Sequence, residues 1–127
     1  KLNHFIRRRT EIAIRYNNAF MGSRIVPQVL PKNATSSYHL YVIRLKLSGF
    51  KITQKEIFDA LRNKGIGVNL HYIPVYRHPY FRDLGFSEGY CDEVERYFKE
   101  ALSLPIFPSL TEDEQEQIIE TILGVLS

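Results

Sequence analysis

Residues 37–47, SYHLYVIRLKL, are the segment that most restricts what this chain can fold into. Aromatic and β-branched residues dominate it, as is typical of strands. At a period of two, Tyr41, Ile43 and Leu45 fall on one face, and Leu40 and Val42 fall on the other. The odd-numbered face is apolar enough to be buried. The segment therefore predicts a strand whose odd-numbered face is covered by other elements.

Helical patterns surround this strand. Residues 3–20 have an amphipathic helical pattern, and Gly22 follows where a helix can close. Thr53 and Glu56 have the spacing of a capping box, in which each side chain satisfies a free backbone N–H of the first turn. Gly65 is placed to end the helix that they open. These signals predict one helix before the strand and one after it.

Two more helices are expected in the second half. Residues 92–102 return to a helical pattern, with acids at the start where the helix dipole favours them. Thr111 and Glu114 form another capping box, which opens a final helix. The apolar stripe of that helix is Ile118, Ile119, Ile122, Leu123 and Leu126.

The remaining segments are extended or irregular. Residues 24–37 are interpreted as a connector that is extended at most, 65–72 as a second strand and 104–108 as a short extended piece. Residues 73–86 fit neither period. We therefore predict an α+β fold in one domain of 127 residues, with helices packed on a small, mostly antiparallel sheet.

Charge is distributed unevenly. Residues 1–64 hold 13 Lys and Arg against 3 Asp and Glu, whereas residues 65–127 hold 4 against 11. A basic half is compatible with a nucleic-acid-binding module. We favour solvated faces of opposite sign on different helices, because Arg7, Arg8 and Arg9 point about 100° apart around a helix and form no single patch.

Composition excludes some classes of protein. No apolar run approaches the roughly 20 residues that span a bilayer, and no secretion signal is visible. Cys91 is the only cysteine, which excludes an internal disulfide and fits a cytoplasmic protein. The chain starts at Lys1 and enters a helical pattern almost at once, so we expect it to be part of a longer protein.

No catalytic motif is evident. The sequence has no glycine-rich phosphate loop, zinc-protease helix or nucleophile elbow. The spacing of His71 and His78 matches no usual ligand pair, so we expect no metal site. His4 is interpreted as a surface residue, and His39 as a hydrogen-bonded residue of the first strand.

The segment HYIPVYRHPY, residues 71–80, combines polar-tipped rings with prolines that restrict the backbone. Such rings can stack on a base or a sugar and hydrogen-bond its hydroxyl groups. The alternative is a loop whose tyrosines simply cover the sheet. The residues alone leave these two interpretations equal.

Four segments together resemble the C-terminal part of the DegT/DnrJ/EryC1/StrS family of sugar aminotransferases. They are RRRTEIAIRYNNAF, SSYHLYVIRL, GIGVNLHYIPVYRHPYF and ALSLPIFPSLTEDEQEQII, and they occur in the family's order over nearly the whole chain. Each motif alone is weak, but the ordered set is specific. In sequence, the last two segments are most similar to the branch that aminates UDP-4-keto-6-deoxy-N-acetylhexosamines, the pseudaminic-acid and spore-coat polysaccharide type.

The resemblance implies the small C-terminal domain of a fold-type I transferase dependent on pyridoxal 5'-phosphate (PLP). Residues 1–22 would be its linker helix and 23–127 its α+β core, within one domain. The parent would be a cytoplasmic homodimer that transfers an amino group, with glutamate as the expected donor, to a nucleotide sugar. No nucleic acid or membrane partner is implied.

The family's catalytic lysine motif and its aspartate partner do not occur in this sequence, so the PLP-binding large domain is expected to be absent. We therefore expect this fragment to bind no cofactor covalently and to be inactive alone. The positions that match the family's motifs are His71, Tyr72, Tyr76 and His39. They are predicted to bind the nucleotide sugar and not to catalyse. The alternative function is a non-catalytic nucleic-acid-binding or interaction module that uses the basic half.

Overall fold

The computed structural model, which describes residues 1–49 and 51–127, alternates helices with short strands. The helices and strands in chain order are α1 (Leu2–Ala19), β1 (Ile25–Pro27), β2 (Tyr41–Leu45), α2 (Gln54–Asn63), β3 (Asn69–Leu70), the 3-10 helix η1 (Val75–Arg77), α3 (Pro79–Asp83), α4 (Asp92–Glu100), β4 (Ala101–Leu104) and α5 (Glu112–Leu126).

The strands of this described part form one sheet in the order β1-β2-β4-β3. Each neighbouring pair is antiparallel, with Ile43 of β2 opposite Leu102 of β4 and Leu70 of β3 opposite the same Leu102. The prediction of an α+β fold on a small antiparallel sheet is confirmed.

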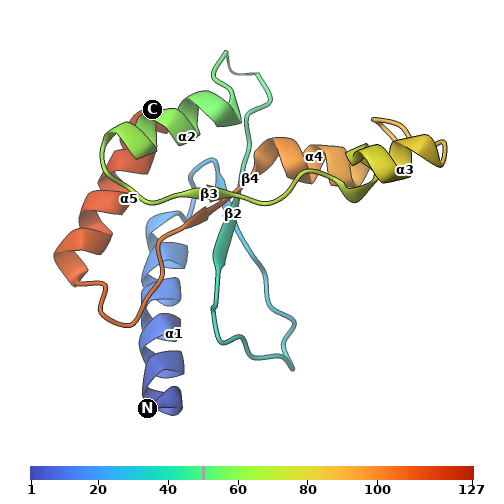
Figure 1. The fold of residues 1–127 in the computed structure, drawn as a ribbon. Helices are drawn as coiled ribbons and strands as arrows, with labels where there is room; N and C mark the ends of the chain where they lie inside the picture. Colours follow the sequence, from blue (N-terminus) through green and yellow to red (C-terminus); the bar gives the residue numbers. More distant parts are fainter. Residues whose placement is uncertain (50) are drawn as a thin grey trace.

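The core lies on the odd-numbered face of β2. Tyr41, Ile43 and Leu45 are fully buried there, as the alternation of the sequence predicted. Helices α1, α2 and α5, strands β1 and β4 and several loop residues supply the other core side chains. In Figure 1 α1 and α5 lie on the same side of the sheet. The ring of Tyr16 in α1 stacks on Tyr41 with ring centroids 4.9 Å apart. The first helix therefore belongs to the same core as the sheet.

Both predicted capping boxes are present. The backbone N–H of Glu56 donates to Thr53 Oγ1 at 3.2 Å, and the Glu56 carboxylate accepts from the Thr53 N–H at 2.7 Å. Thr111 and Glu114 make the same reciprocal contacts at the start of α5. Gly65 follows α2 with a φ of +79°, a conformation that glycine adopts without a Cβ penalty.

The predicted helix over residues 92–102 ends too late. In the structure α4 stops at Glu100, and Ala101 and Leu102 open β4. Every residue of β4 is buried, and the strand pairs with β2 on one side and β3 on the other. Pairing along both edges satisfies more backbone groups than one further helical turn would, and the Gln54 amide donates to the Ala101 carbonyl at the changeover.

Three extended segments also differ from their predicted lengths. The strand predicted over residues 37–47 is paired only over β2, so His39, predicted to lie in this strand, stands before it and is exposed. The strand expected over residues 65–72 is paired only at Asn69–Leu70, opposite Leu102 and Ser103 of β4. The connector over residues 24–37 contains β1, whose residues Ile25–Pro27 pair with the end of β2.

Opposite charges from the two halves of the chain meet on the surface. Arg15 of α1 lies 2.6 Å from a carboxylate oxygen of Glu116 in α5, and Arg44 of β2 lies 2.7 Å from Glu100. Exposed pairs of this kind stabilise a fold by only about 0–1 kcal/mol each. Their arrangement supports the interpretation that the uneven charge forms complementary faces. Among the described residues, no helix has the length and apolar character needed to cross a membrane.

Candidate functional site

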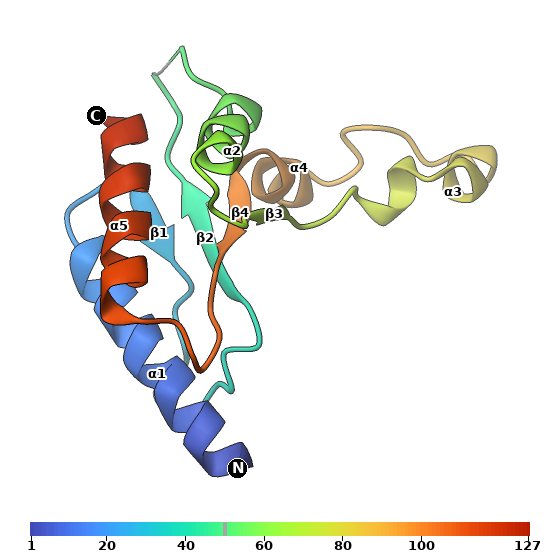
Figure 2. The ribbon, with the colours of Figure 1, turned by 60° about the vertical axis from the view of Figure 1, so that its left-hand side comes forward.

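Residues 72–91 form an arm that projects from the side of the sheet, away from both chain termini (Figures 1 and 2). The arm leaves β3, passes through η1 and α3, and returns to α4. Pro79 occupies the start of α3, where its missing N–H costs no hydrogen bond. Gly85 and Gly89 turn the chain back with φ values of +94° and +83°. The irregular sequence between residues 73 and 86 thus folds into two short helical turns.

Glu95 of α4 fixes the base of this arm. This residue is 8% exposed, and its carboxylate accepts hydrogen bonds from the Tyr76 hydroxyl at 2.8 Å, from the Gly89 N–H at 3.0 Å and from Arg77 Nε at 3.2 Å. Arg77 Nη2 also donates to the second carboxylate oxygen, so the pair is bidentate. A bidentate arginine–carboxylate pair defines orientation as well as distance. Glu95 therefore holds the outgoing and returning ends of the arm together.

The environment at the base of the arm shifts the pKa values of Glu95 and Tyr76. The hydrogen bonds from Arg77, and next from Gly89, lower the pKa of Glu95 to about 2. Burial, and then the hydrogen bond to Glu95, raise the pKa of Tyr76. At neutral pH Glu95 is therefore a carboxylate and Tyr76 is a neutral hydrogen-bond donor.

Aromatic rings contact one another along the arm. Tyr90 lies between Tyr76 and Phe86, with centroid distances of 5.7 Å and 5.0 Å, and Phe86 meets Phe81 edge-on at 6.2 Å. Edge-to-face and tilted pairs at these separations are mutually attractive. The arm is thus a small aromatic cluster attached to the domain through the Glu95 contacts.

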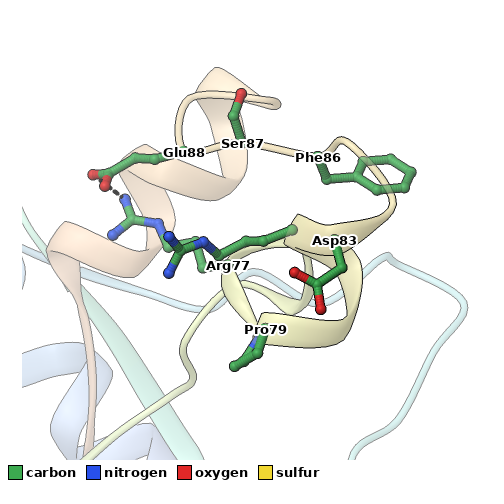
Figure 3. Close-up of a pocket in the computed structure, with 7 residues that line it drawn as sticks. Arg77, Pro79, Asp83, Phe86, Ser87 and Glu88 are labelled. Atoms are coloured by element: carbon green, nitrogen blue, oxygen red, sulfur yellow. Dashed lines mark ion pairs between the residues drawn. The ribbon is translucent and has the colours of Figure 1, made fainter.

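A hollow of about 880 Å³ opens on the arm beside these contacts. Figure 3 shows the Arg77 guanidinium on its wall, paired with Glu88 at 2.7 Å, with Asp83 and Phe86 further along. Two arginines and two acids line the hollow, so its charges balance. The lining residues are Arg77, Pro79, Arg82, Asp83, Phe86, Ser87 and Glu88.

His71, predicted to bind substrate, lies at the inner end of the arm and is only 7% exposed. Its Nε2 shares a 2.7 Å hydrogen bond with Ser103 Oγ of β4, whereas Nδ1 is buried without a partner in the described part of the chain. Burial lowers the pKa of His71, which favours the neutral ring at pH 7.

The other three predicted residues differ in exposure. Tyr72 is 75% exposed, and its ring meets the His71 ring edge-on at 4.7 Å. Tyr76 is partly buried, and its hydroxyl is engaged by Glu95. His39 is exposed just before β2, and within the described residues no contact joins it to the other three. The structure therefore brings His71 and Tyr72 together, connects Tyr76 to them through the chain, and leaves His39 apart.

Sequence reasoning missed Glu95 and Arg77. Cys91 and Phe98 are partly buried and mark the less exposed face of α4. Glu95 lies four residues after Cys91 and three before Phe98, so its carboxylate is on this same face. A charge on that face signals a buried partner, because an unpaired buried carboxylate is costly. Arg77 is that partner, and its guanidinium also lies 5.3 Å from the centre of the Phe98 ring.

Comparison with known proteins identifies the relatives of this fold. The model of the DegT/DnrJ/EryC1/StrS aminotransferase family matches residues 1–123. The chain belongs to this family. The spore coat polysaccharide biosynthesis protein SpsC of Bacillus subtilis is 31% identical over 129 residues, which cover 99% of this chain and 33% of SpsC. The chain therefore spans about a third of the length of the curated relatives it matches.

Solved structures of the family share the fold. Spr1654 of Streptococcus pneumoniae, assigned as a sugar aminotransferase, superposes on 98% of this chain with a TM-score of 0.86 and 30% identity, over 31% of its own length. Helicobacter pylori PseC, an aminotransferase of pseudaminic acid biosynthesis, superposes on 96% of the chain and 33% of its own length with a TM-score of 0.85. At 24% identity PseC supports the fold alone.

Enzymes hold PLP covalently through a lysine. A lysine that forms a Schiff base is usually activated by a desolvated or charged surrounding. Every lysine of this chain is exposed instead; they are Lys1, Lys32, Lys46, Lys51, Lys55, Lys64 and Lys99. In the same described residues, no three His, Cys, Asp or Glu side chains are grouped so as to hold a metal ion.

Proposed function

We propose that this chain is the small C-terminal domain of a PLP-dependent nucleotide-sugar aminotransferase. The superposition on Spr1654 carries the proposal, because it covers 98% of the chain and because Spr1654 has been solved in PLP and pyridoxamine-phosphate forms. A match over the whole sheet and its helices supports a common domain and not a shared motif.

In such an enzyme PLP serves as the electron sink for amino-group transfer. Because the lysines of this chain are all exposed, we propose that the rest of the parent protein holds the cofactor. The contribution of this domain is then to bind and orient the substrate. On this proposal the chain alone is inactive.

Binding by this domain centres on Tyr72. Its exposed ring can stack on a sugar or a base, and its hydroxyl can donate to a sugar oxygen. His71 lies behind that ring and supports it edge-on. His39 is exposed on a different segment, so its contribution requires the substrate or another part of the parent to approach it.

The proposed substrate is a UDP-4-keto-6-deoxy-N-acetylhexosamine, and the proposed amino donor is glutamate. The 31% identity to SpsC supports a role in surface polysaccharide or nonulosonate biosynthesis. We further propose a homodimeric parent that works in the cytoplasm on nucleotide sugars.

The test is turnover by the full-length parent protein. It would be incubated with glutamate and a UDP-4-keto-6-deoxy-N-acetylhexosamine, and the aminated sugar would be measured by mass spectrometry. We expect amination by the wild type and, for Tyr72→Ala, a KM for the sugar raised about tenfold, the equivalent of losing one good contact. Tyr80→Ala is the control, since Tyr80 is a similarly exposed tyrosine of the same arm. If the parent aminates no nucleotide sugar, the proposal is wrong.

A further inference from the structure

Glu95 is the point where the arm is attached to the domain. It accepts hydrogen bonds from Tyr76 and Arg77 on the outgoing side and from Gly89 on the returning side. The outgoing and returning donors lie at least 12 positions apart in the sequence, yet they meet on one carboxylate.

The far part of the arm is largely exposed. Tyr80, Leu84 and Tyr90 are each at least 60% exposed, and α3 lies at the outer end of the arm, far from the sheet (Figure 2). Arg77 is different, because its side chain is only 20% exposed and lies against the Phe98 ring. The orientation of the arm is therefore set at its base, where Arg77 and Glu95 meet.

The same contacts divide the roles of the two tyrosines. The Tyr76 hydroxyl donates its one proton to Glu95, so it has no proton left to donate to a ligand in this arrangement. Tyr72 is exposed and lies four residues earlier, with the buried Pro74 between them. Proline fixes one backbone angle of this short segment, so we expect a shift of Tyr76 to displace Tyr72 as well.

We propose that Glu95 is a positioning residue, which acts through Tyr76 and Arg77 to fix residues 72–77 and so to present Tyr72 to the nucleotide sugar. This inference rests on the proposed function. Glu95 itself touches no substrate. Loss of its charge should weaken binding of the sugar without slowing the chemical step, because losing a contact that is equally strong in the ground state and the transition state raises KM and leaves kcat unchanged.

The experiment compares Glu95→Gln with Glu93→Gln in the full-length parent. Glu93 lies on the same helix but is exposed and pairs only with Arg96, three residues away. For Glu95→Gln we expect the KM for the nucleotide sugar to rise about tenfold, while kcat and the KM for glutamate change less than about twofold. Glu93→Gln should match the wild type. Tyr76→Phe, which removes one of the bonds to Glu95, should raise the same KM by a smaller factor.

Hydrogen exchange of the backbone amides provides the structural readout. Exchange should accelerate over residues 72–77 in Glu95→Gln and stay unchanged in α5. An unchanged KM for the sugar together with faster exchange would overturn the positioning role. Equal rises in both KM values would also overturn it, since they would indicate general unfolding.

Failure of the proposed function would look different. In that case the wild-type parent would aminate no nucleotide sugar, and the positioning of Tyr72 toward such a substrate would be rejected with it. The exchange contrast between Glu95→Gln and Glu93→Gln would still decide whether Glu95 holds the arm.

Discussion

The side-chain amide of Gln115 in α5 donates a 2.8 Å hydrogen bond to the backbone carbonyl of Ile12 in α1. Both residues are 1% exposed, so the bond lies inside the core. It connects the first helix of the chain to the last one across 103 positions of sequence. The two helices therefore enclose the sheet from one side as a connected pair.

Gln115→Ala should destabilise the chain by about 2 kcal/mol, because it removes a buried hydrogen bond and leaves the Ile12 carbonyl without this donor. Urea unfolding followed by circular dichroism measures the change. Gln117→Ala is the matched control, since Gln117 is exposed on the same helix and its loss should cost less than about 0.5 kcal/mol. Equal effects of the two substitutions would contradict the role given to the Gln115 bond.

Each capping box should be worth a separate increment of stability. Thr53→Ala and Thr111→Ala each remove the side chain that accepts a first-turn N–H, so each should cost about 1 kcal/mol. Because the boxes open different helices, the double variant should cost the sum of the two within about 0.5 kcal/mol. Thr35→Ala, at an exposed threonine outside the helices and strands, should leave the unfolding midpoint unchanged. A strongly non-additive double variant would contradict their independence.

The base of the arm should be sensitive to strong acid. The pKa of Glu95 is lowered to about 2 in the folded chain, below the value of about 4.3 expected for an unfolded glutamate. The stabilisation is therefore complete above about pH 4.3 and is lost as the pH falls toward 2. The amide proton of Gly89, which donates to Glu95, is a direct reporter in NMR spectra. We expect its chemical shift to titrate near pH 2 and to lose this step in Glu95→Gln.

The buried His71 should titrate below the ordinary pKa of histidine. Burial lowers its pKa, so between the folded value and about 6.5 the unfolded chain binds more protons than the folded one. The contribution of His71 to stability is therefore complete above about pH 6.5 and falls as the pH drops below that value. NMR titration of the ring protons should give a midpoint below 6.5, and unfolding in urea should restore the ordinary value. A folded midpoint above 6.5 would contradict the buried neutral ring.

Local signals predicted much of the fold correctly. Thr53, Glu56 and Gly65 encode the limits of α2 within a dozen residues, so no distant contact is needed to place it. The odd-numbered residues of β2 likewise showed their buried face by alternation alone.

Ala101 and Leu102 could not be placed in this way. Both are good helix formers that continue a helical pattern, and they become strand only because β2 and β3 pair with them from distant parts of the chain.

In the candidate site, too, local features could be predicted from sequence and long-range contacts could not. Residues 71–80 stood out as a segment, because rings and prolines are visible in sequence. Which ring is buried was not visible: His71 and Tyr72 are neighbours, yet one faces Ser103 and the other faces solvent. The pairing of Arg77 with Glu95 depends on how the arm folds back over 18 positions, and no local pattern reports that.

Locating the cofactor in the full-length parent tests most directly whether this chain is the small domain of a PLP-dependent enzyme. The parent would be reduced with borohydride, which fixes PLP to its lysine, and the modified peptide would be mapped by mass spectrometry beside this chain treated alone. We expect pyridoxal absorbance in the parent, one modified lysine outside the sequence of this chain, and no specific modification of the chain alone. A parent without pyridoxal absorbance, or a modified lysine within residues 1–127, would contradict it.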